Sequence, residues 1–335
     1  MSSFEIKTSE GEIFSSSEEM TILDCALSSN IIFDYSCKSG QCGACKTTLI
    51  KGKVIEIKPQ LALKNKDGQD KFLTCCCVPA SDILINALNL KALQGIEIKI
   101  SPCKINTLNF LSDDILEVTL RVPPNSNFVF LEGQHIDIIG PKTEKRSYSI
   151  ANSSNKKEIK LLIKRYDDGL FSDFWFNEAN LNDLLRMEGP KGTFYLRDKD
   201  KSLVFLATGT GIAPIISILE ELDENSSFLQ DKKISLFWGN REEKDFIWDC
   251  NFKNLEIDFH KVLSRKINIW DGDFGYVQDV ALRKIKNFNE INVFACGSSN
   301  MIESSFQSFT SAGLNPDDFF SDAFVQNYNN SRSVS

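Results

Sequence analysis

The sequence has no apolar run of the roughly 18 residues that a membrane-spanning helix requires. Its first seven residues, Met1 to Lys7, also lack the basic and then apolar order of a secretory signal. Internal repeats are absent as well. These absences predict a cytoplasmic protein without a membrane partner.

An excess of positive charge is missing too. The 335 residues contain 38 Lys and Arg against 46 Asp and Glu, which gives a formal net charge of -8. Nucleic acids bind through their phosphates, which favour clustered Lys and Arg side chains. We therefore expect no nucleic-acid partner.

What the sequence does contain is normal for a globular protein, because 42% of its residues are hydrophobic and 25% are charged. Its length is sufficient for two or three domains. The 10 cysteines are unevenly placed, and most of them precede residue 80. In a reducing compartment we expect them to be thiols or metal ligands rather than disulfides.

The first predicted domain spans residues 1–95. Thr21 is placed to cap a short helix that runs through Leu27, because its hydroxyl can accept a bond from an unpaired backbone N–H group. A cysteine-rich loop follows. Thr47–Ile57 is then typical of two strands that turn at Lys51–Lys53.

The second predicted domain spans residues 97–198. Polar and apolar residues alternate in Ile115–Val122 and in His135–Ile139, and turn signals separate such runs. This pattern favours an antiparallel barrel. Phe171–Arg186 interrupts the pattern as one helix-like stretch.

The third predicted domain spans residues 199–325. Ser202–Ala207, Ile234–Trp238 and Ile291–Ala295 are continuous apolar runs with helical segments between them. Buried strands that alternate with helices indicate a parallel α/β sheet. The Asn- and Ser-rich residues 326–335 are expected to form a flexible tail.

The cysteine-rich loop contains a specific spacing. Cys37, Cys42 and Cys45 stand in Cys-Lys-Ser-Gly-Gln-Cys-Gly-Ala-Cys, and a further cysteine lies 30 positions beyond Cys45. This C-x4-C-x2-C…C order is typical of plant-type [2Fe–2S] proteins, in which four thiolates hold two irons. The small residues between the cysteines allow backbone N–H groups to approach the sulfurs.

A structural zinc site is the competing interpretation. Zinc prefers paired CxxC or Cys/His arrangements, whereas only one CxxC occurs here and no histidine precedes His135. The spacing leaves the fourth ligand open among Cys75, Cys76 and Cys77. Cys25, Cys103 and Cys250 carry no motif and are interpreted as small core residues.

A second motif, Arg146-Ser147-Tyr148-Ser149, follows the predicted strand that ends at Ile139. An Arg side chain can bind a pyrophosphate through two parallel hydrogen bonds. A Tyr ring can lie flat against a flavin ring, and a Ser hydroxyl can reach one of its nitrogens. Gly169–Ser172 is a predicted helix start, where free N–H groups favour phosphate.

A third motif, Thr208-Gly209-Thr210-Gly211-Ile212-Ala213-Pro214, follows a buried strand and opens a helix. Glycines allow the backbone to approach a phosphate closely. Proline replaces the third glycine of the usual dinucleotide fingerprint, so this is not the standard Rossmann motif. Cys296 lies at the end of a later buried strand, where ligands bind in open α/β sheets.

Together these motifs resemble the ferredoxin–NADP reductase superfamily. With the cysteine motif in front, their order is similar to that of the bacterial ferredoxin–flavin–NAD reductases, over residues 1–325. The resemblance implies a multidomain α+β and α/β fold with a β-grasp ferredoxin domain, an antiparallel β-barrel flavin domain and a parallel α/β nucleotide-binding domain.

The resemblance also implies roles for individual residues. The metal ligands would be Cys37, Cys42, Cys45 and Cys75. Ser149 and Cys296 would lie at the site of hydride transfer. The residues that contact FAD or the nicotinamide nucleotide would be Arg146, Tyr148, Ser149, Lys164, Ser172, Thr208, Gly209, Gly211 and Phe324.

The function that the resemblance implies is electron transfer from NAD(P)H to FAD, then to a [2Fe–2S] cluster, and then to a partner protein. NADH is the expected donor, while Ser264-Arg265 keeps NADPH open, because Arg near the ribose can accommodate a 2′-phosphate. The end of the chain, Phe320–Phe324, is similar to the CDP-6-deoxyglucoseen reductases, whose partner is a dehydratase. The alternatives are an oxygenase reductase component and a metal-stabilised binding module without redox activity.

Overall fold

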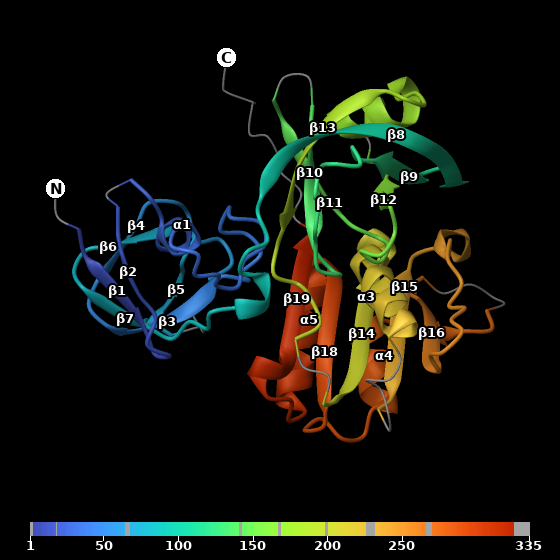
Figure 1. The fold of residues 1–335 in the computed structure, drawn as a ribbon. Coiled ribbons are helices and arrows are strands. Elements are labelled where there is room, and N and C mark those ends of the chain that lie inside the picture. Colours follow the sequence, from blue (N-terminus) through green and yellow to red (C-terminus); the bar gives the residue numbers. More distant parts are fainter. Residues whose placement is uncertain are drawn as a thin grey trace, which may run out of the picture.

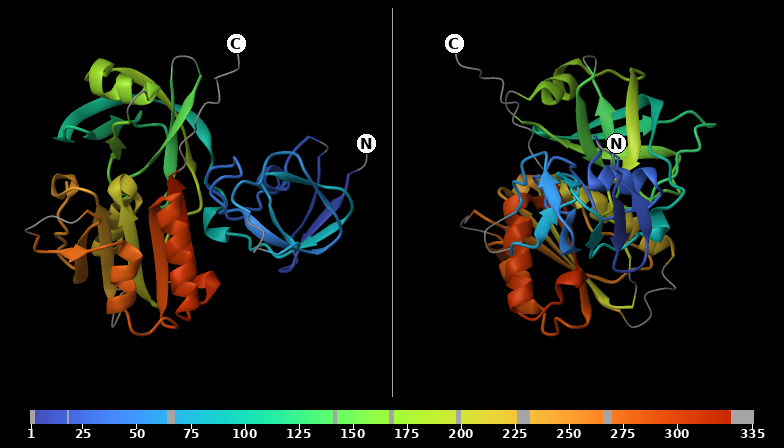
Figure 2. Two further views of the ribbon diagram at one scale, coloured as in Figure 1. Left: turned by 180° about the vertical axis from the view of Figure 1, so that it is seen from behind. Right: turned by 90° about the vertical axis from the view of Figure 1, so that its left-hand side faces the viewer.

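The computed structural model describes residues 3–17, 19–63, 68–140, 143–166, 169–197, 200–225, 232–265 and 270–324. The tail predicted at residues 326–335 lies outside this described part. Three sheet-containing parts follow one another along the chain, and the N-terminal part lies to one side of the other two (Figure 1). The views from behind and from the side show the same arrangement (Figure 2).

The N-terminal part is a mixed five-stranded sheet with one helix, the β-grasp arrangement. Its strands follow the order β2-β1-β7-β3-β5, in which β1 and β7 are parallel, and β4 pairs separately with β6. The elements are β1 (Glu5–Thr8), β2 (Ile13–Ser15), α1 (Ile22–Ser28), β3 (Lys46–Lys51), β4 (Val54–Glu56), β5 (Lys71–Leu73), β6 (Cys77–Pro79), β7 (Ile83–Ile85) and the short helix η2 (Lys91–Leu93).

Two local predictions can be compared with this part. Thr21 caps α1 as predicted, because its Oγ1 accepts the backbone N–H of Asp24 at 3.1 Å. The two strands predicted in Thr47–Ile57 are present. They do not pair with each other, however, because β3 pairs with β5 and β7 while β4 pairs with β6.

The second part is a closed antiparallel barrel. Its six strands follow the order β11-β10-β13-β8-β9-β12, and a bridge between Ile150 and Leu161 joins the two ends of that order. The elements are β8 (Lys99–Ser112), β9 (Ile115–Arg121), β10 (His135–Ile139), β11 (Lys145–Ser149), β12 (Glu158–Lys164), α2 (Leu170–Asp173), the π-helix η3 (Phe174–Glu178) and β13 (Leu184–Lys191).

The helix-like stretch predicted over Phe171–Arg186 is only partly correct. The helical residues end at Glu178, and Leu184 begins β13, where Leu184–Gly189 pair with β8. Pairing with a neighbouring strand therefore overrides the local preference.

The third part is a parallel six-stranded sheet in the order β17-β16-β15-β14-β18-β19. Helix α3 packs on one face, while α4 and α5 pack on the other. The elements are β14 (Ser202–Thr208), the turn η4 (Gly209–Gly211), α3 (Ile212–Glu224), β15 (Ile234–Asn240), η6 (Glu243–Asp245), β16 (Ile257–Leu263), β17 (Asp273–Phe274), α4 (Val277–Lys284), β18 (Ile291–Ser298), α5 (Ser299–Ser311), η7 (Pro316–Asp318) and β19 (Phe319–Phe324).

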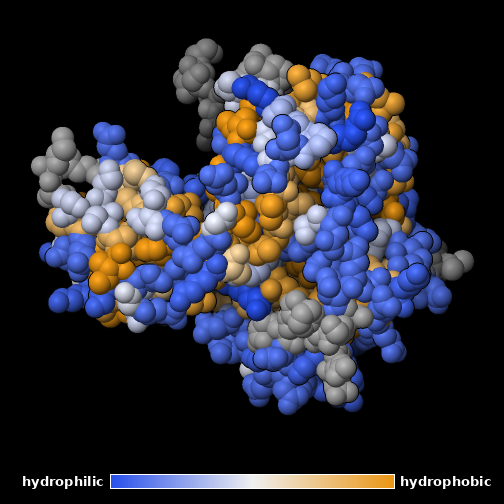
Figure 3. Space-filling view, in the orientation of Figure 1, coloured by the Kyte–Doolittle hydropathy of each residue, from blue (hydrophilic) through white to orange (hydrophobic). Residues whose placement is uncertain are grey.

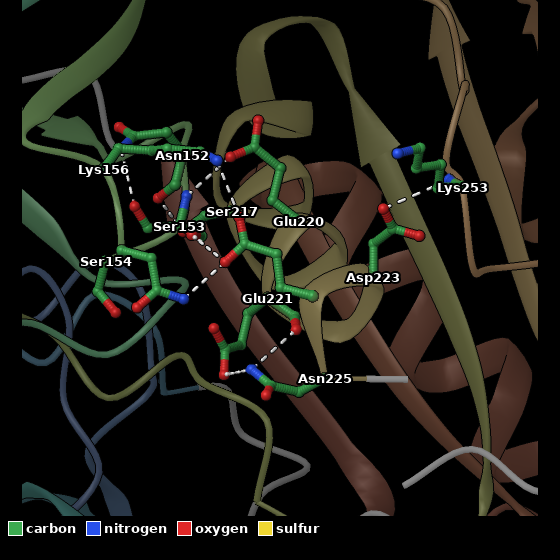
Figure 4. Close-up of polar contacts among 12 residues, drawn as sticks. Asn152, Ser153, Ser154, Lys156, Ser217, Glu220, Glu221, Asp223, Asn225 and Lys253 are labelled. Atoms are coloured by element: carbon green, nitrogen blue, oxygen red, sulfur yellow. Dashed lines mark hydrogen bonds and ion pairs between the residues drawn. The ribbon is translucent and has the colours of Figure 1, made fainter. Parts of the chain in front are cut away.

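The barrel and the parallel sheet share one hydrophobic core. Leu162 and Phe194 of the barrel belong to the same buried cluster as Phe205 and Ile212 of the sheet and α3. Polar contacts border this core (Figure 4): Ser217 Oγ on α3 donates to the carbonyl oxygen of Asn152 at 2.7 Å. These two parts are thereby joined as one unit.

The N-terminal part has a core of its own. Its apolar contact with the barrel is a small cluster around Leu90, Leu93 and Tyr195. In the space-filling view, hydrophobic residues show on the N-terminal part and where it approaches the rest, and hydrophilic residues cover much of the remaining visible face (Figure 3). Within the described ranges, no helix is long and apolar enough to span a bilayer.

Candidate functional site

The loop between α1 and β3 carries the cysteine motif, and its backbone requires glycine. Gly40 and Gly43 adopt φ angles of 77° and 78°, in the left-handed region that favours glycine. A Cβ atom on Gly40 would lie 2.2 Å from the carbonyl oxygen of Pro59 and 2.8 Å from Cys76 Sγ. The small residues of the motif thus let the loop pack tightly under Pro59.

The four predicted ligands form two pairs of sulfur atoms. Cys45 Sγ and Cys75 Sγ lie 3.2 Å apart. In the other pair, the backbone N–H of Cys42 donates to Cys37 Sγ at 3.4 Å, and that of Cys37 to Cys42 Sγ at 3.5 Å. Backbone N–H groups therefore face the sulfurs, as the spacing predicted.

Each pair contains one thiol that loses its proton easily. The hydrogen bond from Cys42 lowers the pKa of Cys37 to about 4, and the hydrogen bond from Cys45 lowers the pKa of Cys75 to about 6. The same bonds raise the pKa of Cys42 and of Cys45. Thiolates are the form that binds metal, so both pairs offer a ligand at neutral pH.

The three cysteines of the triplet, Cys75, Cys76 and Cys77, differ in position and in acidity. Cys75 faces Cys45, whereas Cys76 lies 3.5 Å from Cys75 and points to the carbonyl oxygen of Pro59 at 3.7 Å. Burial raises the pKa of Cys76 and of Cys77 to about 12. Of the three, Cys75 therefore has the position and the acidity of a ligand.

The sulfur geometry fits a two-iron group. Two pairs of thiols match a cluster in which four thiolates hold two irons. The donor set therefore fits a [2Fe–2S] cluster, and the assignment of its four ligands stays a prediction.

The predicted flavin motif lies on β11, which pairs with β10. Tyr148 stands opposite Ile136, and Ser149 stands opposite His135. The hydroxyl of Tyr148 accepts the indole N–H of Trp175 at 3.0 Å, and the two rings meet edge to face. Burial raises the pKa of Tyr148. The tyrosine ring is thus held in one orientation.

The two predicted flavin-binding cations, Arg146 and Lys164, differ in whether they already have an ion-pair partner. Arg146 is half-buried, and within the described ranges its guanidinium has neither a hydrogen-bond nor an ion-pair partner. Lys164 Nζ lies 2.5 Å from Asp114 Oδ2 and 3.7 Å from Asp245 Oδ1. An unpaired cation suits a pyrophosphate, so the residues fit FAD through Arg146 better than through Lys164.

Ser172 lies in α2, at the helix start that the sequence predicted. Its hydroxyl accepts the backbone N–H of Tyr166 at 2.9 Å. A Cβ atom on Gly169 would lie 2.9 Å from Ser172 Oγ. The side chain thus closes the turn before α2, and its contact with a pyrophosphate stays a prediction.

The predicted nucleotide motif joins the ends of β14 and β18. A Cβ atom on Gly211 would lie 2.4 Å from the carbonyl oxygen of Cys296, so only glycine allows this approach. Thr208 Oγ1 accepts the backbone N–H of Ser298 at 3.3 Å. The carbonyl oxygen of Gly209 accepts the indole N–H of Trp238 at 2.9 Å. The turn is therefore fixed to β18 on one side and to β15 on the other.

Cys296 and Phe324 lie near this turn. The thiol of Cys296 is fully buried, and burial raises its pKa, so it is a neutral group. Phe324 pairs with Ser298 across β18 and β19 and packs against the core shared with the barrel. Their contacts with nicotinamide and with flavin stay predictions.

Asp322 links the parallel sheet to the N-terminal part, and the sequence assigned it no role. It lies opposite Cys296 in the sheet and is 4% exposed. Its Oδ1 accepts the hydroxyl of Ser36, the residue before Cys37, at 2.6 Å. Burial raises the pKa of Asp322, while His135 of the barrel acts in the opposite direction. Asp322 therefore ties the residue before Cys37 to the strand beside Cys296.

Three known domain families match the three parts of the chain in the same order. The 2Fe-2S iron-sulfur cluster binding domain matches residues 5–80, the oxidoreductase FAD-binding domain residues 102–195, and the oxidoreductase NAD-binding domain residues 205–306. These matches confirm the three predicted kinds of cofactor: a [2Fe–2S] cluster, FAD and a nicotinamide nucleotide.

The chain also resembles named proteins over nearly its whole length. The CDP-6-deoxy-L-threo-D-glycero-4-hexulose-3-dehydrase reductase of Yersinia pestis is 38% identical over 320 residues, which are 94% of this chain and 96% of that protein. Terephthalate 1,2-dioxygenase reductase component 2 of Comamonas sp is 28% identical over 317 residues, 91% of this chain and 92% of that protein.

Among solved structures, the cytochrome P450 reductase GcoB of Amycolatopsis has the same fold. Its TM-score is 0.73 at 21% identity, with 96% of this chain and 99% of that chain covered. The fold, the family matches and the full-length relative agree on an oxidoreductase that moves electrons from NAD(P)H through FAD and [2Fe–2S] to a partner. The chain therefore belongs to the ferredoxin–NADP reductase-like family of iron–sulfur flavoprotein reductases.

Proposed function

We propose that this reductase delivers its electrons to a dehydratase that acts on a CDP-linked deoxysugar. The proposal is supported by the 38% identity to a dehydrase reductase over 94% of the chain, against 28% for a dioxygenase component. That identity is the observation that carries the choice of partner, while the contact of Ser36, beside Cys37, with Asp322 on β19 supports electron transfer within the chain.

The cofactors would supply the redox chemistry, because a flavin can accept one hydride with its two electrons and release these singly to an iron–sulfur cluster, which carries one electron at a time. The protein's task is to hold and align them. Cys37 and Cys42 would hold one iron, and Cys45 and Cys75 the other, since these are the pairs whose sulfurs and backbone groups meet.

The flavin would be held from β11. The free guanidinium of Arg146 would bind the pyrophosphate, and the fixed ring of Tyr148 would lie against the ring system. Ser149, which is buried and stands opposite His135 on β10, would place its hydroxyl at a ring nitrogen.

The nicotinamide nucleotide would bind at the carboxyl end of the parallel sheet. Gly209 and Gly211 would let the backbone approach the phosphates closely, and Thr208 would border the nicotinamide. Cys296, which is buried and neutral, would stay protonated beside the position of hydride transfer and exclude water there.

A reducing compartment such as the cytoplasm suits this arrangement. All 10 cysteines are free thiols, and at least four are needed as ligands. A cytoplasmic location also gives access to the NADH pool.

The test uses purified holoprotein, assayed with NADH and with NADPH. We expect about two irons and two sulfides per chain, a flavin spectrum that bleaches with NADH, and turnover of a CDP-sugar dehydratase. A purified dioxygenase serves as the alternative acceptor. Reduction of the dioxygenase but not of the dehydratase would reject the proposed partner, and absence of iron and flavin would reject redox activity altogether.

A further inference from the structure

Three consecutive residues directly before the first predicted cluster ligand are all bound to residues outside their own domain. They are Asp34, Tyr35 and Ser36, and Cys37 follows. Their partners lie on the segment after β13 and on β19. The cysteine loop is therefore anchored at its base to both other parts of the chain.

The first anchor is an ion pair between Asp34 and Arg197. Arg197 Nη1 donates to Asp34 Oδ2 at 2.9 Å, and Nη2 donates to Asp34 Oδ1. Nη2 also donates to the carbonyl oxygen of Thr193 at 2.9 Å. A guanidinium that binds a carboxylate through two parallel bonds fixes the angle as well as the distance between the two groups.

The same guanidinium touches all three parts of the molecule. Its Cζ lies 5.3 Å from the ring centre of Tyr195 and 5.0 Å from that of Phe320 on β19. The side chain of Arg197 is 16% exposed and that of Asp34 is 41% exposed. The pair is therefore a half-buried contact stacked between aromatic rings rather than a free surface ion pair.

The second and third anchors act on the backbone and on Ser36. Thr193 Oγ1 accepts the backbone N–H of Tyr35 at 3.0 Å and donates to Asp34 Oδ1 at 2.9 Å. Ser36 donates to Asp322 at 2.6 Å. Because Tyr35 is 5% exposed, its backbone bond is shielded from water.

These anchors are needed because the apolar contact of this domain is small. It consists of the cluster around Leu90, Leu93 and Tyr195 and of Cys42, which packs against the core under α5. Domains that meet through small interfaces move relative to each other by default. Electron transfer depends steeply on the separation of the two redox groups, so such motion would slow it.

We propose that Arg197 is a positioning residue for internal electron transfer, which it supports by holding Asp34, and with it the base of the cluster loop, against the flavin and nucleotide parts. Arg197 touches neither the predicted ligands nor the predicted flavin contacts. The proposal rests on the electron route proposed above.

The test compares Asp34→Asn and Arg197→Gln with wild-type holoprotein. Arg121→Gln is the matched control, because among the described residues the side chain of Arg121 makes one surface hydrogen bond, to Asn182 on the barrel at 2.9 Å. Stopped-flow absorbance with NADH follows flavin and cluster separately. Hydrogen–deuterium exchange of residues 34–45 reports docking without reference to activity.

We expect flavin reduction by NADH to be unchanged within about twofold and cluster reduction to slow by about tenfold in both anchor variants, since a small misplacement of reacting groups costs that much or more. Exchange in residues 34–45 should rise in these variants and stay unchanged in Arg121→Gln. The reversed pair Asp34→Arg with Arg197→Asp should restore part of the rate.

Cluster reduction at the wild-type rate in both variants would overturn the proposal. So would a loss of iron parallel to the loss of rate, because the pair would then maintain the cluster fold rather than its position. A wild-type protein whose cluster is not reduced by NADH would instead reject the proposed electron route itself, so the two failures are distinguishable.

Discussion

The two interfaces of this molecule are built differently. The barrel and the parallel sheet share one buried core, in which Phe194 of the barrel meets Phe294 of β18 edge to face at 5.8 Å. The cluster domain keeps its own core and meets the others through a small apolar cluster and the contacts of Asp34 and Ser36. The shared core makes one unit for hydride chemistry, while the polar contacts dock a separate electron carrier.

The difference between the two interfaces matches the different needs of hydride transfer and of single-electron transfer. Hydride transfer needs flavin and nicotinamide in direct contact, which a continuous core can guarantee. Single-electron transfer works across a gap, so a docked domain is sufficient if its position is fixed. The predictions below test each interface separately.

The largest effect is expected from removing a cluster ligand. Cys75→Ser takes away the thiolate of the Cys45 pair, so iron content should fall from about two per chain to near zero. NADH should still bleach the flavin, because the barrel and sheet unit is untouched. Iron analysis and visible absorbance measure both results.

Cys76→Ser is the control for this prediction, since Cys76 points to Pro59 rather than to Cys45. Retention of a full cluster in Cys75→Ser together with its loss in Cys76→Ser would reassign the fourth ligand.

The next effect is on stability. Phe194→Ala opens a cavity in the shared core and should cost about 3–5 kcal/mol of unfolding free energy. Because the core belongs to both parts, barrel and sheet should lose stability in one transition, which calorimetry and tryptophan fluorescence can compare. Separate transitions of the two parts would contradict a shared core.

A smaller effect is expected from salt on the docked interface. Raising the salt from about 0.05 M to about 0.5 M shortens the screening length roughly threefold, which weakens the partly exposed Asp34–Arg197 pair. Cluster reduction in the wild-type protein should then slow by about twofold. The rate in Arg197→Gln should not respond, and an equal response in both proteins would argue against the pair as the cause.

The smallest effect is expected from Glu224, at the rim of the shared core. Its hydrogen bonds with Asn155, Lys156 and Ser153 lower its pKa. A carboxyl with a lowered folded pKa stabilises above the unfolded value of about 4.3, and this stabilisation is lost as pH falls through the folded pKa. Because the group is largely exposed, Glu224→Gln should cost less than about 1 kcal/mol at pH 7.

Unfolding free energies measured between about pH 7 and pH 3 test the sign, since the gap between wild type and Glu224→Gln should close only below about pH 4. A gap that widens on acidification would contradict the assignment.

Local signals in the sequence predicted much of the fold and of the site. The cysteine spacing, the Arg146–Ser149 strand and the Thr208–Gly211 turn each depend on residues that are close in the sequence. The structure has Arg146–Ser149 on β11 and packs Gly211 against the carbonyl oxygen of Cys296. The family and its cofactor classes follow from the joint order of these motifs.

Contacts between distant segments could not be predicted. Asp34 and Arg197 are 163 positions apart, and Ser36 and Asp322 are 286 positions apart. No periodicity or spacing connects such residues, because tertiary packing alone brings them together. The same reason explains why Leu184–Arg186, predicted to be helical, forms part of a strand beside β8.

The most direct test of the account is whether electrons reach the cluster within one chain. Holoprotein is mixed with NADH in a stopped-flow instrument, and cluster reduction is followed over about a hundredfold range of protein concentration. A docked cluster domain predicts a rate constant that does not depend on protein concentration. A rate that rises in proportion to concentration would show that the cluster of one chain is reduced by the flavin of another, and would contradict the account.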